Sequence, residues 1–261
     1  MSISPARSAA FDILFRTEHE RAFSSILLAE YEQRLTPRDR ALCHHLTLGV
    51  LRRQIYLDRA IAFFTKEKKI DLAVRISLRM GIFQLFFLDR VPAHSAVNES
   101  VNLVQRSRKG SARGFVNAVL RRAEREGFSP VYADDLERVE VETSHPRWLL
   151  DKWSDDLGPD TAALIAEANN SPPSIAFRST ARALSGTVFQ EAVPSDFVPG
   201  CLIAAKRTAE MASAAERGEI YFQDEGSQLV GHAVRIATGG KFLDVCAAPG
   251  SKATQIAMNA P

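Results

Sequence analysis

The chain has 261 residues, 46% of them hydrophobic and 25% charged, so its composition is that of a globular protein and excludes collagen, coiled coil and disorder. The sequence contains no apolar run of membrane-spanning length and no export signal at its start. Its three cysteines are too few for a disulfide framework. These observations predict a cytoplasmic protein without membrane contact. Residues 1–125 carry 22 Lys and Arg against 12 Asp and Glu, whereas the remaining residues carry 11 against 19, so the N-terminal part favours a polyanionic partner such as nucleic acid.

The first part of the chain has the apolar period of helix after helix. Two helix starts are recognisable, since Ser4 precedes Pro5, and Thr36 precedes Pro37 with an acid, Asp39, at the third helical position. Further apolar stripes run through residues 42–50, 57–64, 73–87, 97–104 and 115–120. We therefore expect an all-α domain of six or seven helices over residues 1–128.

The middle of the chain has a mixed pattern. Residues 129–143 are acidic and lack an apolar period, which predicts a linker. The segment 144–215 then predicts a small α+β subdomain, because an aromatic helix from Pro146 to Trp153 is followed by strand-like alternation. The expected strands are Ile175–Ser179, Val198–Lys206 and Glu219–Gln223.

The end of the chain, residues 216–261, is regular again. A helix is expected from about Glu225 to Ala237, then a buried strand from Lys241 to Val245 and a loop of small residues, 246–250, that opens another helix. This order lets backbone N–H groups approach a nucleotide-like cofactor at the carboxyl edge of a parallel sheet. An ordinary strand-to-helix connection has the same pattern, so the loop alone leaves both interpretations open.

The full string of this loop is more specific. Asp-x-Cys-Ala-Ala-Pro-Gly-x-Lys at 244–252 resembles the S-adenosylmethionine loop of the Sun/Fmu family of RNA 5-methylcytosine methyltransferases, although Ser251 stands where the family usually has a second glycine. Gln223-Asp224, His145-Pro146-Arg147-Trp148 and the segment 169–178 also resemble family segments. The resemblance implies an RRM-like subdomain at 144–215 and the first βα unit of a Rossmann-like methyltransferase domain at 216–261. It implies that S-adenosyl-L-methionine is bound by Cys246, Ala247, Ala248, Pro249, Gly250, Ser251 and Lys252.

The helical part carries a second resemblance. Asn98-Glu99-Ser100-Val101 and the segment 114–121 look like the signature of NusB-like RNA-binding domains, which precede the catalytic part in the bacterial small-subunit ribosomal RNA branch of the family. RNA, and specifically small-subunit ribosomal RNA, is therefore the expected partner. Seven basic residues near this signature, with only Glu124 opposing them, suit phosphate contact as a group, although each alone suits a solvated helix face equally well. They are Arg106, Arg108, Lys109, Arg113, Arg121, Arg122 and Arg125.

The cysteines do not fit the chemistry of this family. Methylation at C5 of cytosine needs a thiolate that adds at C6, and the family supplies it from a Pro-Cys motif, with a second cysteine in a Thr-Cys motif, well beyond the cofactor loop. Cys43 and Cys201 lie in apolar stretches that predict burial, and Cys246 belongs to the loop itself. We expect the nucleophile beyond Pro261, no catalytic or metal-binding residue within the chain, and no methyl transfer by these 261 residues alone.

Two other functions stay open. The chain could be a non-catalytic RNA-binding or antitermination module, which coding sequence after Pro261 without Pro-Cys and Thr-Cys motifs would favour. A nucleotide-binding oxidoreductase is disfavoured because the spacing Gly-x-Gly-x-x-Gly is missing. Trp148 and Trp153 could stack on bases, but their apolar neighbours favour packing, and His145 is expected to be a structural hydrogen bonder rather than a base. The oligomeric state is not predicted.

Overall fold

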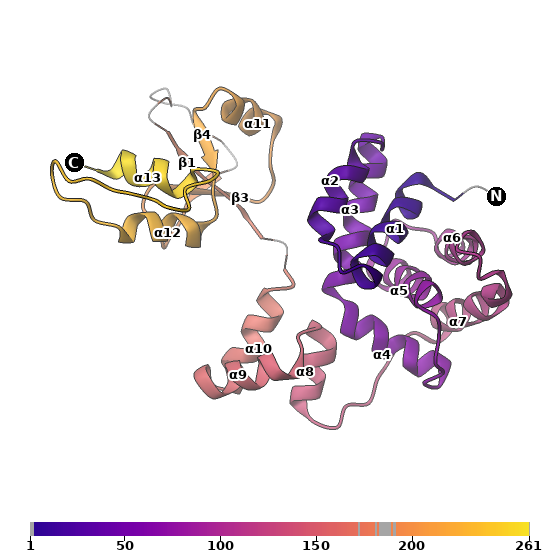
Figure 1. Cartoon of the computed structure of the whole chain (residues 1–261). Helices are drawn as coiled ribbons and strands as arrows, with labels where there is room; N and C mark the ends of the chain where they lie inside the picture. Colours follow the sequence, from indigo (N-terminus) through magenta and orange to yellow (C-terminus); the bar gives the residue numbers. More distant parts are fainter. Residues whose placement is uncertain (1–2, 172, 181, 183–188, 190–191, 261) are drawn as a thin grey trace. The chain divides into compact units, whose positions relative to one another are not determined.

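The computed structural model describes residues 3–171, 173–180, 182, 189 and 192–260 (Figure 1). The chain forms two compact units, Met1–Ser171 and Pro172–Pro261. The first is helical throughout, and the second holds a small sheet with helices. None of the described helices is long and apolar enough to cross a membrane.

Seven α-helices within the described residues form the N-terminal bundle, which confirms the expected number. Ser4 Oγ accepts from Arg7 N at 3.4 Å and Thr36 Oγ1 from Asp39 N at 3.3 Å, so both predicted caps form. A continuous apolar core joins the helices. The helices are α1 (Pro5–His19), α2 (Ser24–Glu32), α3 (Pro37–Arg52), α4 (Gln54–Thr65), α5 (Leu72–Phe87), α6 (Ala93–Arg106) and α7 (Arg113–Glu126), with a 3₁₀ turn at Gly110–Ala112 before α7.

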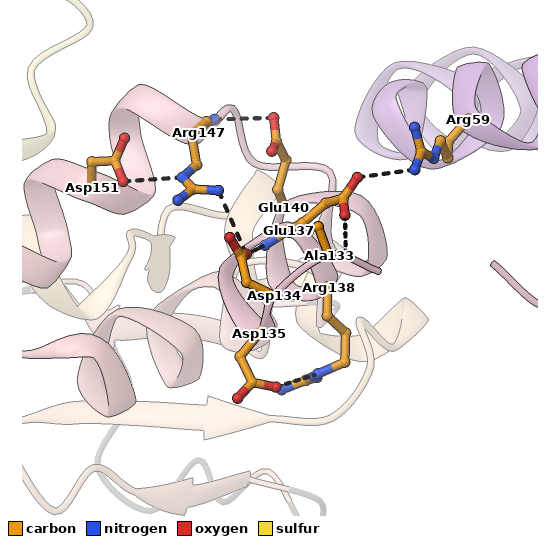
Figure 2. Close-up of polar contacts among 9 residues, drawn as sticks. All are labelled: Arg59, Ala133, Asp134, Asp135, Glu137, Arg138, Glu140, Arg147 and Asp151. Atoms are coloured by element: carbon orange, nitrogen blue, oxygen red, sulfur yellow. Dashed lines mark hydrogen bonds and ion pairs between the residues drawn. The ribbon is translucent and has the colours of Figure 1, made fainter. Parts of the chain in front are cut away.

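The expected linker 129–143 is wrong over most of its length, because it contains helix α8 (Asp135–Thr143). Its acidic residues are the signals of a helix start, since Asp134 caps the helix and acids in the first turn complement the helix dipole. The helix docks on α4, where Arg59 Nη2 donates to Glu137 Oε1 at 2.9 Å (Figure 2). Arg53 Nη1 also donates to the backbone oxygen of Glu142 at 2.6 Å. The unit boundary therefore falls after Ser171 rather than near residue 143.

Two further helices, α9 (Arg147–Leu157) and α10 (Pro159–Ala168), pack on α8 around buried Leu150. Trp153 packs against this cluster as predicted, with its ring centroid 5.6 Å from that of His145. Trp148 is 67% exposed, so its predicted packing role is wrong. Five residues along a helix turn a side chain by about 140°, which puts the two indoles on different faces.

The second unit contains a four-stranded antiparallel sheet in the order β2-β3-β1-β4. The strands are β1 (Ile175–Ser179), β2 (Ala192–Pro194), β3 (Cys201–Ala204) and β4 (Ile220–Phe222), so all three predicted strand positions are occupied. Phe177 on β1 is fully buried and packs with Met211 of helix α11 (Ala209–Glu216). The sequence predicts such strands within an α+β subdomain at 144–215, but those bounds are wrong, because α9 and α10 belong to the first unit and β4 lies beyond residue 215.

The last part of the chain differs from its prediction. Helices α12 (Glu225–Ala233) and α13 (Ser251–Asn259) form and pack on each other (Figure 1), but the predicted strand 241–245 does not. Leu243 and Val245 are 83% and 85% exposed. A strand of a parallel sheet needs paired neighbours and cover on both faces, and no described strand pairs with this segment. The Rossmann-like βα unit thus remains a prediction, of which the helix alone is formed.

Candidate functional site

The predicted cofactor loop is an exposed turn that leads into α13. Cys246, Ala247, Ala248 and Pro249 are all exposed, and Gly250 and Ser251 are half-buried. The turn begins with an Asp244 Oδ1 that accepts from Cys246 N at 3.0 Å, and the peptide between Ala248 and Pro249 is cis. Gly250 then adopts φ +100°, a conformation that residues with a side chain rarely reach, and starts the helix.

The start of α13 leaves backbone N–H groups without a side-chain cap among the described residues. No side chain caps this helix, so its first backbone N–H groups have no partner from a capping residue. Unpaired N–H groups and the helix dipole favour an anion, and alanine side chains leave room for a close approach. These properties fit the carboxylate of S-adenosyl-L-methionine. Lys252 is exposed on the first turn and adds a positive charge there.

A buried arginine on strand β1 holds the first turn of α13 in place. Arg178 of β1 is 5% exposed, and its Nη2 donates to the backbone oxygen of Ser251 at 3.1 Å and to Thr254 Oγ1 at 2.9 Å. Its Nε donates to Gln223 Oε1 at 2.8 Å. No carboxylate pairs with this guanidinium among the described residues, and burial lowers the pKa of Arg178, with Tyr221 opposing this effect. The strand is thereby tied directly to the helix that follows the loop.

Three buried glutamines extend this contact. Gln223 Nε2 donates to Gln255 Oε1 at 2.9 Å, and Gln255 Nε2 donates to the backbone oxygen of Gln228 at 2.9 Å. Gln228 Nε2 donates to the backbone oxygen of Gln223 at 2.8 Å, which closes the ring. The ring of bonds joins the end of β4 to α12 and α13. We call Arg178 and these three glutamines the glutamine network.

Sequence reasoning placed Arg178 and Gln223 in segments that resemble the Sun/Fmu family, but it did not bring them together. Gln228 and Gln255 were missed. A signal was present, since Arg178 follows three apolar residues of the strand, and an arginine inside a sheet requires polar partners. Nothing local in the sequence says which residues those partners are.

The cysteines are placed as the sequence predicts. Cys43 and Cys201 are buried, and burial raises the pKa of Cys43 to about 11 and also raises the pKa of Cys201. Cys246 is exposed. His145 is a structural hydrogen bonder, with Nδ1 at 3.0 Å from the backbone oxygen of Thr143. The described residues contain no cluster of His, Cys, Asp or Glu that could hold a metal ion.

The basic group at 106–125 is more neutralised than its sequence indicates. Arg106 pairs with Asp12 at 2.7 Å and Lys109 with Asp71 at 2.9 Å, both across the bundle. Arg121, Arg122 and Arg125 pair with nearby glutamates on α7. Only two of the seven, Arg108 and Arg113, lack an ion pair within the described part of the chain. Most of the predicted phosphate contacts therefore already have a carboxylate partner.

Comparisons with known proteins agree with the motifs. The model of the NusB family matches residues 4–125. The chain is 32% identical to "Probable ribosomal RNA small subunit methyltransferase B" of Bacillus subtilis (strain 168), over 98% of this chain and 60% of that protein. It is 31% identical to "Ribosomal RNA small subunit methyltransferase B" of Pseudomonas putida, over 96% of this chain and 59% of that protein. The chain thus spans about 60% of the length of these curated relatives.

A solved structure shares the fold. The one described as "Crystal Structure of PH0851" superposes with a TM-score of 0.67 at 20% identity, over 98% of this chain and 61% of that chain. At this identity the likeness concerns the fold alone. Residues 4–125 therefore match the NusB family, and almost the whole chain aligns with proteins named ribosomal RNA small subunit methyltransferase B, the Sun/Fmu relatives that its motifs indicated.

Proposed function

We propose that the chain is part of an S-adenosyl-L-methionine-dependent methyltransferase that modifies C5 of a cytosine in small-subunit ribosomal RNA. Residues 1–128 bind RNA, the four-stranded sheet of the second unit supplies an RRM-like subdomain that includes β4 in place of α9 and α10, and the chain after this sheet begins the methyltransferase domain. The observation that carries this proposal is the string 244–252 in a chain that aligns almost throughout with proteins of that name. The four-stranded antiparallel sheet supports the RRM-like assignment. A ribosomal RNA substrate also favours a cytoplasmic location.

In this proposal the loop residues Cys246 to Lys252 hold the methyl donor. The donor, when bound, supplies an electrophilic methyl group. The open N–H groups of α13 receive its carboxylate, and the alanines allow the backbone to approach closely. Arg178 orients the turn, because its bonds to Ser251 and Thr254 fix the first turn of the helix against β1.

We further propose that residues 1–261 alone transfer no methyl group. A nucleophile must reach C6 of the base as a thiolate. Cys43 and Cys201 are buried and have raised pKa values, so neither is an accessible thiolate at neutral pH. Cys246 is accessible, but it belongs to the loop that holds the donor. The nucleophile is therefore assigned to a residue outside this chain.

The test uses the product of the complete open reading frame with unmodified small-subunit ribosomal RNA and labelled methyl donor. We expect 5-methylcytosine in the RNA by mass spectrometry. Gly250→Asp should reduce transfer more than tenfold, because it puts a negative charge where the donor's carboxylate binds, on the order of 1.4 kcal/mol or more. Gly239→Asp is the matched control, since this glycine also has positive φ, +72°, and lies in an exposed turn.

Three results would count against the proposal. Label on another atom of the RNA would disprove the cytosine-5 assignment, and equal loss of transfer in both variants would disprove the role of the loop. Transfer by residues 1–261 alone would show that the nucleophile lies within this chain.

A further inference from the structure

A cavity of about 640 Å³ opens on the helical bundle, between α3 and the end of α5. Roughly 300–1,000 Å³ is the usual range for small-ligand sites, so it has room for one nucleotide. Its wall includes Arg40, His44, His45 and Arg52 from α3, with Phe83 and Phe87 from α5. All lining residues lie in the first unit, and of them only Asn170 belongs to a segment, 169–178, that resembles the Sun/Fmu family.

The arginines of this wall have no carboxylate partner within the described part of the chain. Arg40 uses only Nε, which donates to the backbone oxygen of Leu35 at 2.9 Å, and Arg52 is exposed without a described partner. Burial lowers the pKa of Arg53, and the adjacent charge of Arg52 lowers it further, so two like charges repel each other here. Glu32 is the one carboxylate among the residues described on the wall. The excess positive charge is available to a ligand.

The cavity therefore differs from the basic group at 106–125, where five of seven side chains are ion-paired. A phosphate that binds a paired arginine must compete with the carboxylate already there. A phosphate that binds Arg40 or Arg52 displaces no carboxylate of the described residues. Charge complementarity thus favours the α3 cavity as the place where RNA phosphates bind.

The floor of the cavity is aromatic. The rings of Phe83 and Phe87 are stacked with centroids 5.4 Å apart and an interplanar angle of 22°, and His45 meets Phe83 edge-on at 6.1 Å. The guanidinium of Arg53 lies 5.3 Å above the Phe87 ring. Aromatic and guanidinium planes are the surfaces on which unpaired bases stack in complexes with single-stranded RNA.

We propose that the α3 cavity binds one unpaired nucleotide of single-stranded RNA, with Arg40 and Arg52 on its flanking phosphates and the base against His45 and the Arg53 guanidinium that covers Phe87. The inference rests on the proposed action on RNA and adds to it a site on the NusB-family domain. A duplex is not the expected ligand, since its bases are stacked and paired and cannot enter a cavity. A protein partner would not require phosphates, so the test separates the two.

The experiment measures binding of the 261-residue chain to a fluorescein-labelled 12-nucleotide single-stranded RNA by anisotropy at several salt concentrations. The variant Arg40→Gln/Arg52→Gln should weaken binding about tenfold, and the magnitude of the slope of log K against log salt should fall by about 1.4, since each phosphate contact on a single strand contributes about 0.7. Arg108→Gln/Arg113→Gln is the matched control, because it removes two unpaired arginines from the same domain. We expect it to change affinity less than twofold.

A second measurement locates the RNA directly. The same oligonucleotide with 5-iodouridine is photocrosslinked to the unmodified chain, and the adducts are expected in peptides from α3 or the end of α5. Equal loss of affinity in both double variants, or adducts only at 106–125 or in the second unit, would overturn the proposal. So would unchanged RNA affinity in Arg40→Gln/Arg52→Gln, the result that a site for a protein would give. Methyl transfer by the complete protein is a separate readout, and its failure leaves this outcome unchanged.

Discussion

The helical bundle and the segment around α13 are stabilised in different ways. The bundle buries a continuous set of apolar side chains from seven helices within the described residues. Helix α13 buries one large apolar side chain, Ile256, and is otherwise fastened through the glutamine network. The stabilisation from apolar burial is the sum of many small contributions, so the loss of one contact leaves the others in place. A buried polar network, in contrast, is stable only while every member has its hydrogen-bond partner.

The difference bears on function. A bundle with a dense core can present a fixed cavity such as the one beside α3. The loop between α12 and α13 exposes Phe242, Leu243 and Val245, so few apolar contacts resist its local opening. The comparison therefore predicts a rigid α3 cavity and a low local stability of the loop that we propose for the cofactor.

The largest expected contrast between the two regions is in thiol reactivity. Cys43 lies in the bundle core with a pKa of about 11, whereas Cys246 is exposed in the loop. At pH 8, iodoacetamide should modify Cys246 at least about a thousandfold faster, because Cys43 is both unionised and accessible only on opening of the bundle. Peptide mass spectrometry over time gives both rates, and labelling in urea gives the control in which all three cysteines react alike. Rapid modification of Cys43 would show that the bundle opens as readily as the loop.

The next effect is a packing effect inside the bundle. Gly49 on α3 lies against Phe83, and an added Cβ would come within 2.1 Å of its Cζ. Gly49→Ala should lower the free energy of unfolding of the bundle by about 1–3 kcal/mol, the usual cost of overpacking. Gly114→Ala is the control, since Gly114 on α7 has open space around it, and this variant should gain up to about 1 kcal/mol from helix propensity. Hydrogen exchange of the slowest bundle amides measures both, and equal behaviour of the two variants would mean that Phe83 moves aside freely.

Much of this fold is predictable from the sequence because its signals are local. The caps at Ser4 and Thr36 use a residue three positions away, and the alternation of Ile175–Ser179 lies within one strand. The acidic start of α8 was also local, but it was mistaken for the composition of a linker. Where the residues that determine an element lie within that element, the element is predictable from the sequence.

The site is less predictable because its contacts are not local. Arg178 meets Gln223 and Thr254, which are 45 and 76 positions away, and no periodicity links them. The expected strand 241–245 has suitable residues, but a strand exists only where another strand pairs with it. The α3 cavity was invisible for the same reason, since the paired arginines of 106–125 and the unpaired ones of α3 look alike in the sequence.

The smallest expected effect tests the contribution of the glutamine network to the stability of α13. Arg178→Met keeps most of the side-chain volume but removes the bonds to Gln223, Ser251 and Thr254. We expect hydrogen exchange of the α13 amides to indicate a loss of about 1–2 kcal/mol, because the lost bonds are partly offset by relief of a buried charge without a counterion.

Arg207→Met is the matched control for this variant. Arg207 is exposed in the same unit and lies 4.5 Å above the Phe222 ring without touching α13. It should leave α13 exchange unchanged, and both variants should leave the bundle amides unchanged. Unaltered α13 exchange in Arg178→Met would assign the stability of this helix to Ile256 and its packing on α12, and the two regions would then be held in the same way, by apolar burial.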